Sequence, residues 1–253
     1  MKKPSFYSLL LFVGIIGIWE WIVYACQIRP LILPAPSAIF AQLITQLLNG
    51  YFWPHIWATL LEIIGGFILG SIMGIGLGFL IAQSDTVRNI IQPYLIASQA
   101  MPKLALAPLL ATWFGFGYEP KIIIVALICF FPLLESTITG LTFVDQERLE
   151  LFRSLRASKR QTLLKLRLPT AVPYIFSGLR VAVVLSVVGA VVSEFVGANK
   201  GLGALIISAQ YDTTLIFSAF ILLTLMGLFL YEGIHWTEKL LFKKYHHSRR
   251  EWR

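Results

Sequence analysis

Three carboxylates stand within or at the ends of long apolar runs of the chain: Glu62, Glu135 and Glu194. A charge inside a membrane is costly, so such side chains usually face a water-filled cavity or a partner group. Glu62 lies near one end of its run, where it would reach water. Glu135 follows Pro132, whose ring frees a backbone carbonyl, and Glu194 ends its run. We predict that Glu135 and Glu194 lie along a translocation pathway. The alternative for each is a hydrogen bond between helices or a contact with lipid headgroups.

The sequence carries no motif of a catalytic or nucleotide-binding site. It has no GxxxxGK[ST] phosphate loop, no HExxH pair, no serine elbow and no CxxC pair. Tyr211-Asp212 is similar to one motif of intramembrane aspartyl proteases, but the second aspartate in a Gly-x-Gly-Asp setting is missing. None of the four histidines has ligand spacing with an acid or a cysteine. We therefore expect no catalytic residue, no metal and no cofactor in this chain.

The composition is that of a membrane protein. Of the 253 residues 57% are hydrophobic and 13% are charged, whereas a soluble domain has about 45–50% and about 25%. The apolar residues form long runs, which predicts one all-α polytopic domain over residues 1–253 with about six membrane-spanning helices. The third run is short and broken by Pro102 and Pro108, so it should be packed against protein. The expected spans are 7–25, 59–82, 104–117, 121–141, 172–196 and 215–237.

The distribution of Lys and Arg predicts the orientation of the chain. The loops on the side of the two termini hold sixteen of these residues, and the loops on the other side hold three. Cytoplasmic loops are enriched in Lys and Arg, so both termini and the loop 142–170 should be cytoplasmic. This loop bias also accounts for the net charge of +8, and we expect no nucleic-acid partner.

Two segments have the periodicity of helices that pack closely. Four glycines recur at every fourth position of the second span, so they share one face where another backbone can approach; a groove facing a ligand is the alternative. They are Gly66, Gly70, Gly74 and Gly78. Between the first two spans, an apolar stripe from Ile39 to Leu48 predicts a helix in the membrane interface, capped by Ser37 and ended by Gly50. The alternative is a helix packed on its neighbours.

The stretch "ELFRSLRASKRQTLLKLRLPTAVPY", residues 150–174, gathers much of the charge. Its basic residues are Arg153, Arg156, Lys159, Arg160, Lys165 and Arg167. Apolar residues flank a polar turn, with Leu151, Phe152 and Leu155 before it and Leu163, Leu164 and Leu166 after it. We expect two short helices under the membrane, ended by Pro169 before the next span. A loop that only sets topology needs no apolar face, so this face indicates a protein partner or docking on the bundle itself.

This stretch resembles the cytoplasmic loop of ABC importer permeases, whose pattern is Glu-Ala-Ala, three residues, Gly, about nine to eleven residues, and then a hydrophobic residue followed by Leu-Pro. Glu150 matches the first position, Leu151 and Phe152 stand at the alanines, Arg156 stands at the glycine and Leu168-Pro169 closes the pattern. The segments "ILPAPSAIF", "PLLATWFGFGYEPKI", "LPTAVPYIFSGLRVAV" and "GAVVSEFVGANKGLG" resemble permeases of the nitrate, sulfonate and taurine group, which includes permeases for thiamine-precursor pyrimidines. The resemblance extends from about residue 30 to residue 240.

The resemblance implies a type I importer permease fold in the bacterial inner membrane, with a five-helix core and one additional N-terminal helix. It also implies a second permease copy, two ATPase subunits that hold ATP and Mg, and an extracytoplasmic solute-binding protein. The residues it assigns to ATPase coupling are Glu150, Leu151, Phe152, Leu155, Arg156, Ser158, Leu168 and Pro169. The family glycine permits a turn with positive φ, in which a non-glycine residue costs roughly 1 kcal/mol. Either the turn differs here, or the ATPase supplies an acidic contact to Arg156.

Two other classes of protein are alternatives. A self-contained secondary transporter would carry inverted repeats, and a membrane enzyme would carry a catalytic pair; the sequence shows neither. The substrate class is the open question. Transport of nitrate or a sulfonate would favour a fixed positive charge near the middle of the membrane, and no such charge is evident. This favours a neutral or cationic solute such as a pyrimidine.

Overall fold

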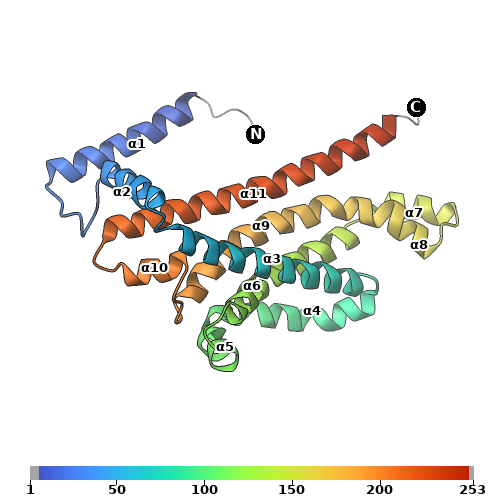
Figure 1. Cartoon of the computed structure of the whole chain (residues 1–253). Coiled ribbons are helices and arrows are strands. Elements are labelled where there is room, and N and C mark those ends of the chain that lie inside the picture. The colour runs from blue at the N-terminus through green and yellow to red at the C-terminus, as the bar shows by residue number, and fades with distance from the viewer. Residues whose placement is uncertain (1–5, 251–253) are drawn as a thin grey trace. The chain divides into compact units, whose positions relative to one another are not determined.

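The computed structural model describes residues 6–250, which fold into helices joined by turns (Figure 1). Two of the elements are short: η1 is a 3₁₀ turn and η2 is a π-helical turn. In chain order the elements are α1 (Phe6–Ala25), α2 (Pro36–Leu48), α3 (Trp53–Ile81), α4 (Asp85–Ala100), η1 (Lys103–Leu106), α5 (Ala107–Phe114), α6 (Glu119–Thr142), α7 (Gln146–Ser154), α8 (Lys159–Thr162), η2 (Leu163–Arg167), α9 (Leu168–Glu194), α10 (Leu202–Ser208) and α11 (Thr213–Arg250).

The described residues include four helices that are long and apolar enough to cross a membrane, which confirms the all-α polytopic fold. They are Trp53–Ile81, Glu119–Thr142, Lys159–Glu194 and Thr213–Leu241. The helices Asp85–Ala100 and Lys103–Phe114, bent by 73° at the break between them, could form a fifth span. The first expected span, 7–25, is also an apolar helix. Its segment Leu10–Ala25 is shorter than each of the four helices above.

The expected third span, 104–117, is wrong in its extent. The segment that could form this span also includes the helix α4, which precedes the expected span, and the chain bends between α4 and the helical segment Lys103–Phe114. Met101 has the extended dihedrals φ −67° and ψ 129°, as expected for a residue that precedes a proline, here Pro102. Helix α4 has no buried residue, and its mixed polar and apolar sequence gives no long apolar run.

The chain divides into two compact units. One contains α1, α2, α10 and the first part of α11, up to Leu225. In this unit the side of α2 that carries Ile39 and Leu43 is buried, while Phe40, Ile44 and Leu48 are exposed. Half of the apolar stripe thus packs on neighbouring elements. This agrees with the alternative prediction for this segment, a helix packed on its neighbours.

The expected cap of α2 is wrong. Ala35 is the N-cap residue and Pro36 fills the first helical position. The Ser37 side chain donates instead to Glu20 Oε1 at 2.6 Å, and the Ser37 N–H donates to Glu20 Oε2 at 3.0 Å. Ser37 therefore joins α2 to α1. Gly50 follows the end of the helix with φ +80°, as expected.

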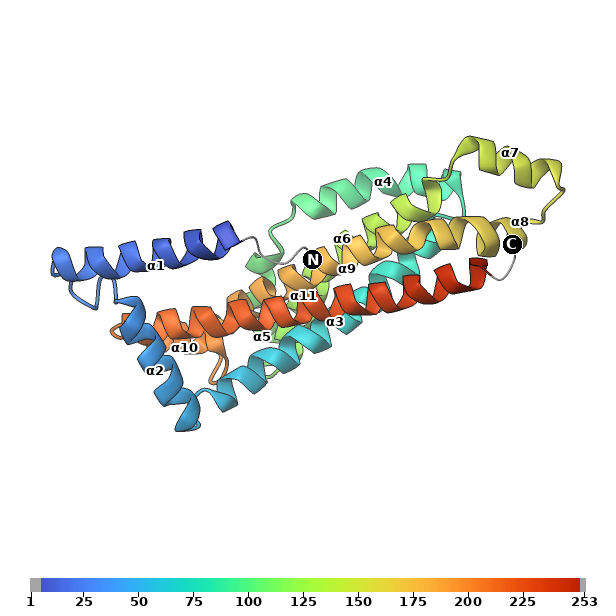
Figure 2. The same ribbon diagram turned by 90° about the horizontal axis from the view of Figure 1, so that it is seen from above.

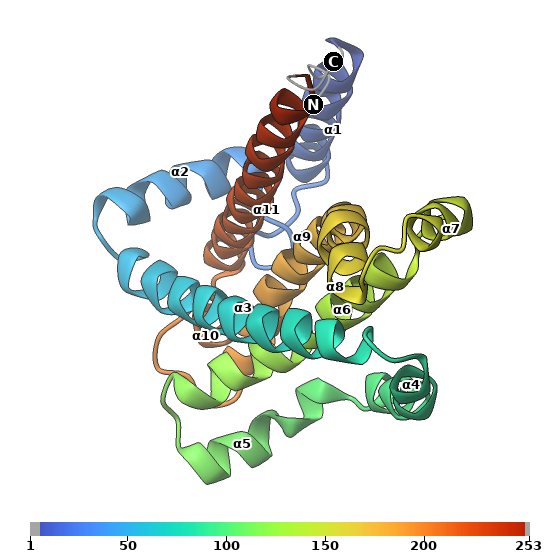
Figure 3. The same ribbon diagram turned by 90° about the vertical axis from the view of Figure 1, so that its right-hand side faces the viewer.

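The second unit, which begins at Leu60 in α3 and includes α4 to α9, is built around α3, α6 and α9 (Figures 2 and 3). Its core contains Ile63, Val125, Cys129, Leu133, Ala182 and Ala190. The Cys129 thiol donates to the Ala182 carbonyl at 3.3 Å and so satisfies its weak donor inside the core. Met226 and Leu230 of α11 pack against the same core.

The four glycines of α3 face the backbone of α6. A Cβ atom added at Gly70 would lie 2.6 Å from the Ala126 carbonyl oxygen, and one at Gly74 would lie 2.6 Å from that of Phe130. At Gly66 and Gly78 the carbonyl oxygens of Ile122 and Leu134 lie at 2.9 Å from the added atom. The α6 carbonyls also recur at every fourth residue, so the two helices meet backbone to backbone along this face.

Candidate functional site

The segment predicted to couple to an ATPase forms α7, a turn, α8 and η2. Asp145 caps α7 by accepting from the Glu147 N–H at 3.2 Å. No residue of α7 is buried. Glu150, Leu151 and Leu155 are exposed, and Phe152 is half-buried. With 57% and 69% of their surface accessible, Leu151 and Leu155 present an apolar face that the unit itself does not cover.

Arg156 adopts the left-handed turn that the family pattern assigns to glycine. Its φ is +50°. The Arg156 N–H donates to the Arg153 carbonyl and the Ala157 N–H donates to the Phe152 carbonyl, both at 2.9 Å. These two bonds form a Schellman motif, which normally has glycine at this position. The turn is therefore retained, and Arg156 carries the backbone strain that glycine would avoid.

An Arg156→Gly variant should stabilise this turn. Removing the strain of a side chain in the left-handed region is worth about 1 kcal/mol, so exchange of the Arg156 and Ala157 backbone amides should slow roughly fivefold. Hydrogen exchange read by mass spectrometry measures this. The matched control is Ala157→Gly, because the φ of Ala157 is not positive; it should speed the exchange. Equal exchange in Arg156→Gly and the parent protein would show that the turn is not strained.

Ser158 begins the next helix. Its hydroxyl accepts from the Gln161 N–H at 3.2 Å, and the Gln161 side chain accepts from the Ser158 N–H at 2.8 Å. This reciprocal capping box fixes the start of α8 directly after the Arg156 turn.

Leu168-Pro169 does not end the coupling segment, contrary to the sequence prediction. The chain is helical without a break from Lys159 to Glu194. Pro169 has no N–H and its ring crowds the preceding turn, and the π-helical turn η2 lies directly before it. Leu168 packs against the buried cluster of Ala82, Leu141 and Ala171. The second part of the coupling segment, α8 and η2, thus forms one continuous helix with the span α9.

Glu135 lies on an open groove between α4 and α6. The groove has a volume of about 270 Å³. Its polar lining consists of Arg88, Gln92, Gln99, Glu135, Thr139 and Thr142. The Gln99 side chain donates to Glu135 Oε2 at 3.4 Å. Arg88, which forms an ion pair with Asp85 at 2.9 Å, also lines the groove, so the groove offers a carboxylate, a paired guanidinium, amides and hydroxyls to a solute.

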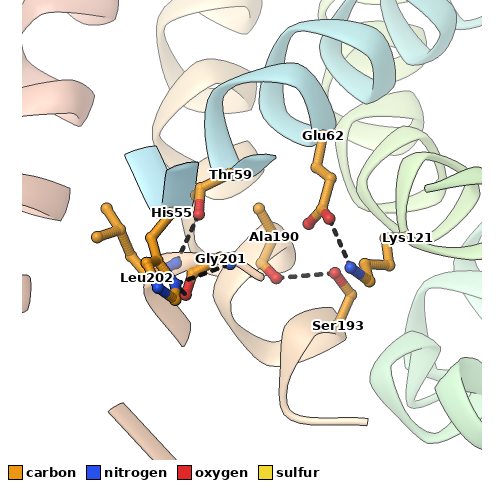
Figure 4. Close-up of polar contacts among 8 residues, drawn as sticks. All are labelled: His55, Thr59, Glu62, Lys121, Ala190, Ser193, Gly201 and Leu202. Carbon is orange, nitrogen blue, oxygen red and sulfur yellow. Dashed lines mark hydrogen bonds and ion pairs between the residues drawn. The ribbon is translucent and has the colours of Figure 1, made fainter. Parts of the chain in front are cut away.

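Glu194 lies in a different environment from Glu135. Its side chain is buried, with 1% of its surface exposed, and it faces the carboxylate of Glu62. Lys121 donates to Glu62 Oε1 at 2.7 Å, and the side chains of this pair are 8% and 0% exposed (Figure 4). Beside Glu194, the Ser193 hydroxyl donates to the Ala190 carbonyl at 2.8 Å. Two carboxylates and one ammonium group thus join α3, α6 and α9.

The sequence does not predict this charge cluster. The sequence predicts that Glu62 reaches water, but its side chain is fully buried. Lys121 is buried in the first turn of α6. The three residues come from separate spans, and no local spacing relates them. The only signal was the presence of each charge next to an apolar run.

In the other unit, a second group of polar contacts ties α10 to the start of α3. Gly201, the N-cap residue of α10, has no side chain to cap the helix. The Thr59 hydroxyl accepts from the Leu202 N–H at 2.8 Å and takes that place (Figure 4). His55 Nδ1 lies 2.9 Å from the Gly201 carbonyl oxygen. This cluster fixes a helix end and presents no catalytic pair.

The described residues contain no group of three or more His, Cys, Asp or Glu side chains that could hold a metal ion.

Residues 66–244 match the family described as the binding-protein-dependent transport system inner membrane component. The chain belongs to this family. It is 39% identical over 230 residues to a probable ABC transporter permease protein of Haemophilus influenzae, with 90% of this chain and 93% of that protein covered. It is 36% identical to the formylaminopyrimidine transport permease protein ThiX of Halalkalibacterium halodurans, over 94% of each chain.

The fold agrees with this membership. The structure is similar to that of a chain of the MetNI methionine ABC transporter in an inward-facing conformation, with a TM-score of 0.64, 17% sequence identity and coverage of 74% of this chain and 94% of that one. The type I importer permease fold is therefore confirmed. This protein is the membrane-spanning permease subunit of an ABC importer and not an enzyme; ATP hydrolysis resides in a separate subunit. Permeases of this family work with an ATPase and a solute-binding protein.

Proposed function

We propose that this permease carries a neutral or cationic nitrogen heterocycle of the aminopyrimidine type along the groove of Glu135. The observation that carries the proposal is the exposed Glu135 carboxylate among the side chains of Gln92, Gln99, Thr139 and Thr142. Amide and hydroxyl groups both donate and accept hydrogen bonds, as a ring with nitrogen atoms and amino groups requires. A carboxylate accepts from an amino group and repels a sulfonate or nitrate. The printed name of the formylaminopyrimidine relative agrees with this class.

A Glu135→Gln variant tests this proposal. A hydrogen bond from a neutral group to a charged group is worth about 1.5–3 kcal/mol, so uptake should fall about tenfold or more. The measurement is uptake of radiolabelled formylaminopyrimidine into vesicles that contain the complete transporter. Recovery of the complex in detergent should not change, because Glu135 is exposed and its one hydrogen bond among the described residues is to the Gln99 side chain.

Glu119→Gln is the matched control, since this exposed carboxylate stands on the same helix but outside the groove. The proposal fails if Glu135→Gln transports the pyrimidine as well as Glu119→Gln does. It also fails if the parent transporter carries taurine or an alkyl sulfonate and not the pyrimidine.

We further propose an assembly of two copies of this chain with two ATPase subunits and an extracytoplasmic solute-binding protein in the bacterial inner membrane. Both termini and residues 142–170 would be cytoplasmic, as the excess of Lys and Arg on that side supports. Leu151, Phe152 and Leu155 would dock into the ATPase, because they present the apolar face of α7. The continuous helix from Lys159 to Glu194 would carry the movement of the ATPase into the membrane.

A further inference from the structure

A basic pocket lies between α7, the α8–η2 helix and the end of α3. Its volume is about 320 Å³. Three cationic side chains line it: Arg153 from α7, Lys159 from α8 and Arg167 from η2. The other lining residues are Gln83, Leu149, Ala157, Thr162 and Leu163. None of these described residues is acidic, so three positive charges converge on one cavity without a neutralising side chain in its wall.

None of these three cations forms an ion pair among the described residues. Arg88, Arg148 and Arg180 are each within salt-bridge distance of a carboxylate, whereas Arg153, Lys159 and Arg167 are not. Like charges gathered at close range repel each other, and an anion between them removes that cost. An Arg guanidinium presents a planar fork of donors that fits two phosphate oxygens, and Lys adds a point charge.

The pocket lies on the face of α7 opposite its exposed apolar residues. Leu149 and Arg153 are four positions apart, so they share the helix face that lines the pocket. Leu151 and Leu155 are also four positions apart, but they fall about 200° around the helix from Leu149 and Arg153. The exposed apolar face therefore points away from the pocket. A partner that docks on Leu151 and Leu155 does not by that contact fill the space between the three cations.

The position of the pocket along the helices indicates the source of the anion. Gln83 stands two residues after the end of α3, and Arg167 directly precedes the start of α9. The pocket thus lies beside the ends of two helices that are long and apolar enough to cross a membrane, and clustered Lys and Arg next to a membrane-spanning helix attract anionic lipid. We propose that Arg153, Lys159 and Arg167 bind the phosphate of an anionic phospholipid of the adjacent leaflet. A free phosphate ion shares the same chemistry and is the other source to be tested.

The test compares two triple variants of the complete transporter. One is Arg153→Gln/Lys159→Gln/Arg167→Gln. The matched control is Arg148→Gln/Arg160→Gln/Lys165→Gln, which removes the same charge from the same segment at residues that do not line the pocket. Purified transporter is mixed with fluorescent phosphatidylglycerol in phosphatidylcholine vesicles, and lipid bound next to the protein is measured by energy transfer from its tryptophans. A parallel sample in pure phosphatidylcholine vesicles receives inorganic phosphate, whose binding is measured calorimetrically.

The control variant keeps the three charged donors that line the pocket and the pocket variant loses them, so the pocket variant should bind the labelled lipid about tenfold or more weakly than the control variant. Equal lipid binding by the two variants would overturn the proposal. So would binding of inorganic phosphate that phosphatidylglycerol does not displace, because the site would then take the free ion. Loss of the ATPase subunits from the pocket variant alone, with lipid binding unchanged, would assign the three cations to the ATPase contact. None of these readouts depends on which solute is transported.

Discussion

A Gly74→Leu variant should yield little folded transporter, whereas Gly76→Leu should yield as much as the parent protein. A Cβ atom at Gly74 would meet the Phe130 carbonyl oxygen at 2.6 Å and the Leu133 Cβ atom at 3.0 Å. The first of these atoms belongs to the backbone of α6 and cannot turn aside as the end of a flexible side chain can. The two helices would therefore have to separate, and the contacts at Gly70 and Gly78 on the same face would loosen with them.

The expected size of the effect follows from the cost of overfilling a packed core. Such insertions typically cost 1–3 kcal/mol, and a clash with backbone belongs at the upper end, about 3 kcal/mol or more. The measurements are the recovery of complex from detergent by size exclusion and its thermal unfolding midpoint. Gly76 is the matched control because it lies on the same helix and a Cβ atom there would have nothing within 4 Å. Equal recovery and equal midpoints for the two leucine variants would show that α3 and α6 do not meet along this face.

A Lys121→Met variant should lose stability through the charge it leaves behind. Lys121 is the cation of the buried pair with Glu62, whose side chain has no exposed surface. Removing one partner of a buried ion pair leaves the other charge uncompensated, at a cost of about 3–5 kcal/mol. The thermal unfolding midpoint in detergent should fall clearly. Lys200→Met is the control for loss of a lysine, because Lys200 is exposed on a loop, and it should have little effect.

The double variant Glu62→Gln/Lys121→Met separates the charge from the loss of packing. Neutralising Glu62 removes the orphaned charge, so the double variant should recover much of the stability that Lys121→Met loses. Glu194 remains in place in all of these variants. If the double variant is no more stable than Lys121→Met, the lysine contributes through its packing and its contact with the Tyr118 ring, which lies 5.5 Å away. If Lys121→Met is as stable as Lys200→Met, the buried pair is not formed.

Features of this protein that depend on residues close together in the chain could be predicted from the sequence. Runs of apolar residues marked the spans α3, α6, α9 and α11, because a helix that crosses a lipid bilayer must be apolar over about 20 consecutive residues. Glycines at every fourth position fall on one face of a helix wherever that helix packs. The short pattern from Glu150 to Pro169 led to the permease family because its docking helix and turn are one continuous stretch of chain.

Contacts between residues far apart in the chain could not be predicted and became known from the fold. Lys121 and Glu62 are separated by 59 positions, and nothing in the sequence near either residue indicates that Glu194 completes their cluster. The fold also revealed the bend after α4 and the continuous helix through Pro169. It placed Glu135 on an open groove and Glu194 in a buried cluster. The physical reason is the same in each case. A proline removes a backbone hydrogen bond, and whether the chain turns there depends on the groups that the fold packs around it. A charge can be buried only where the fold brings an opposite charge close to it.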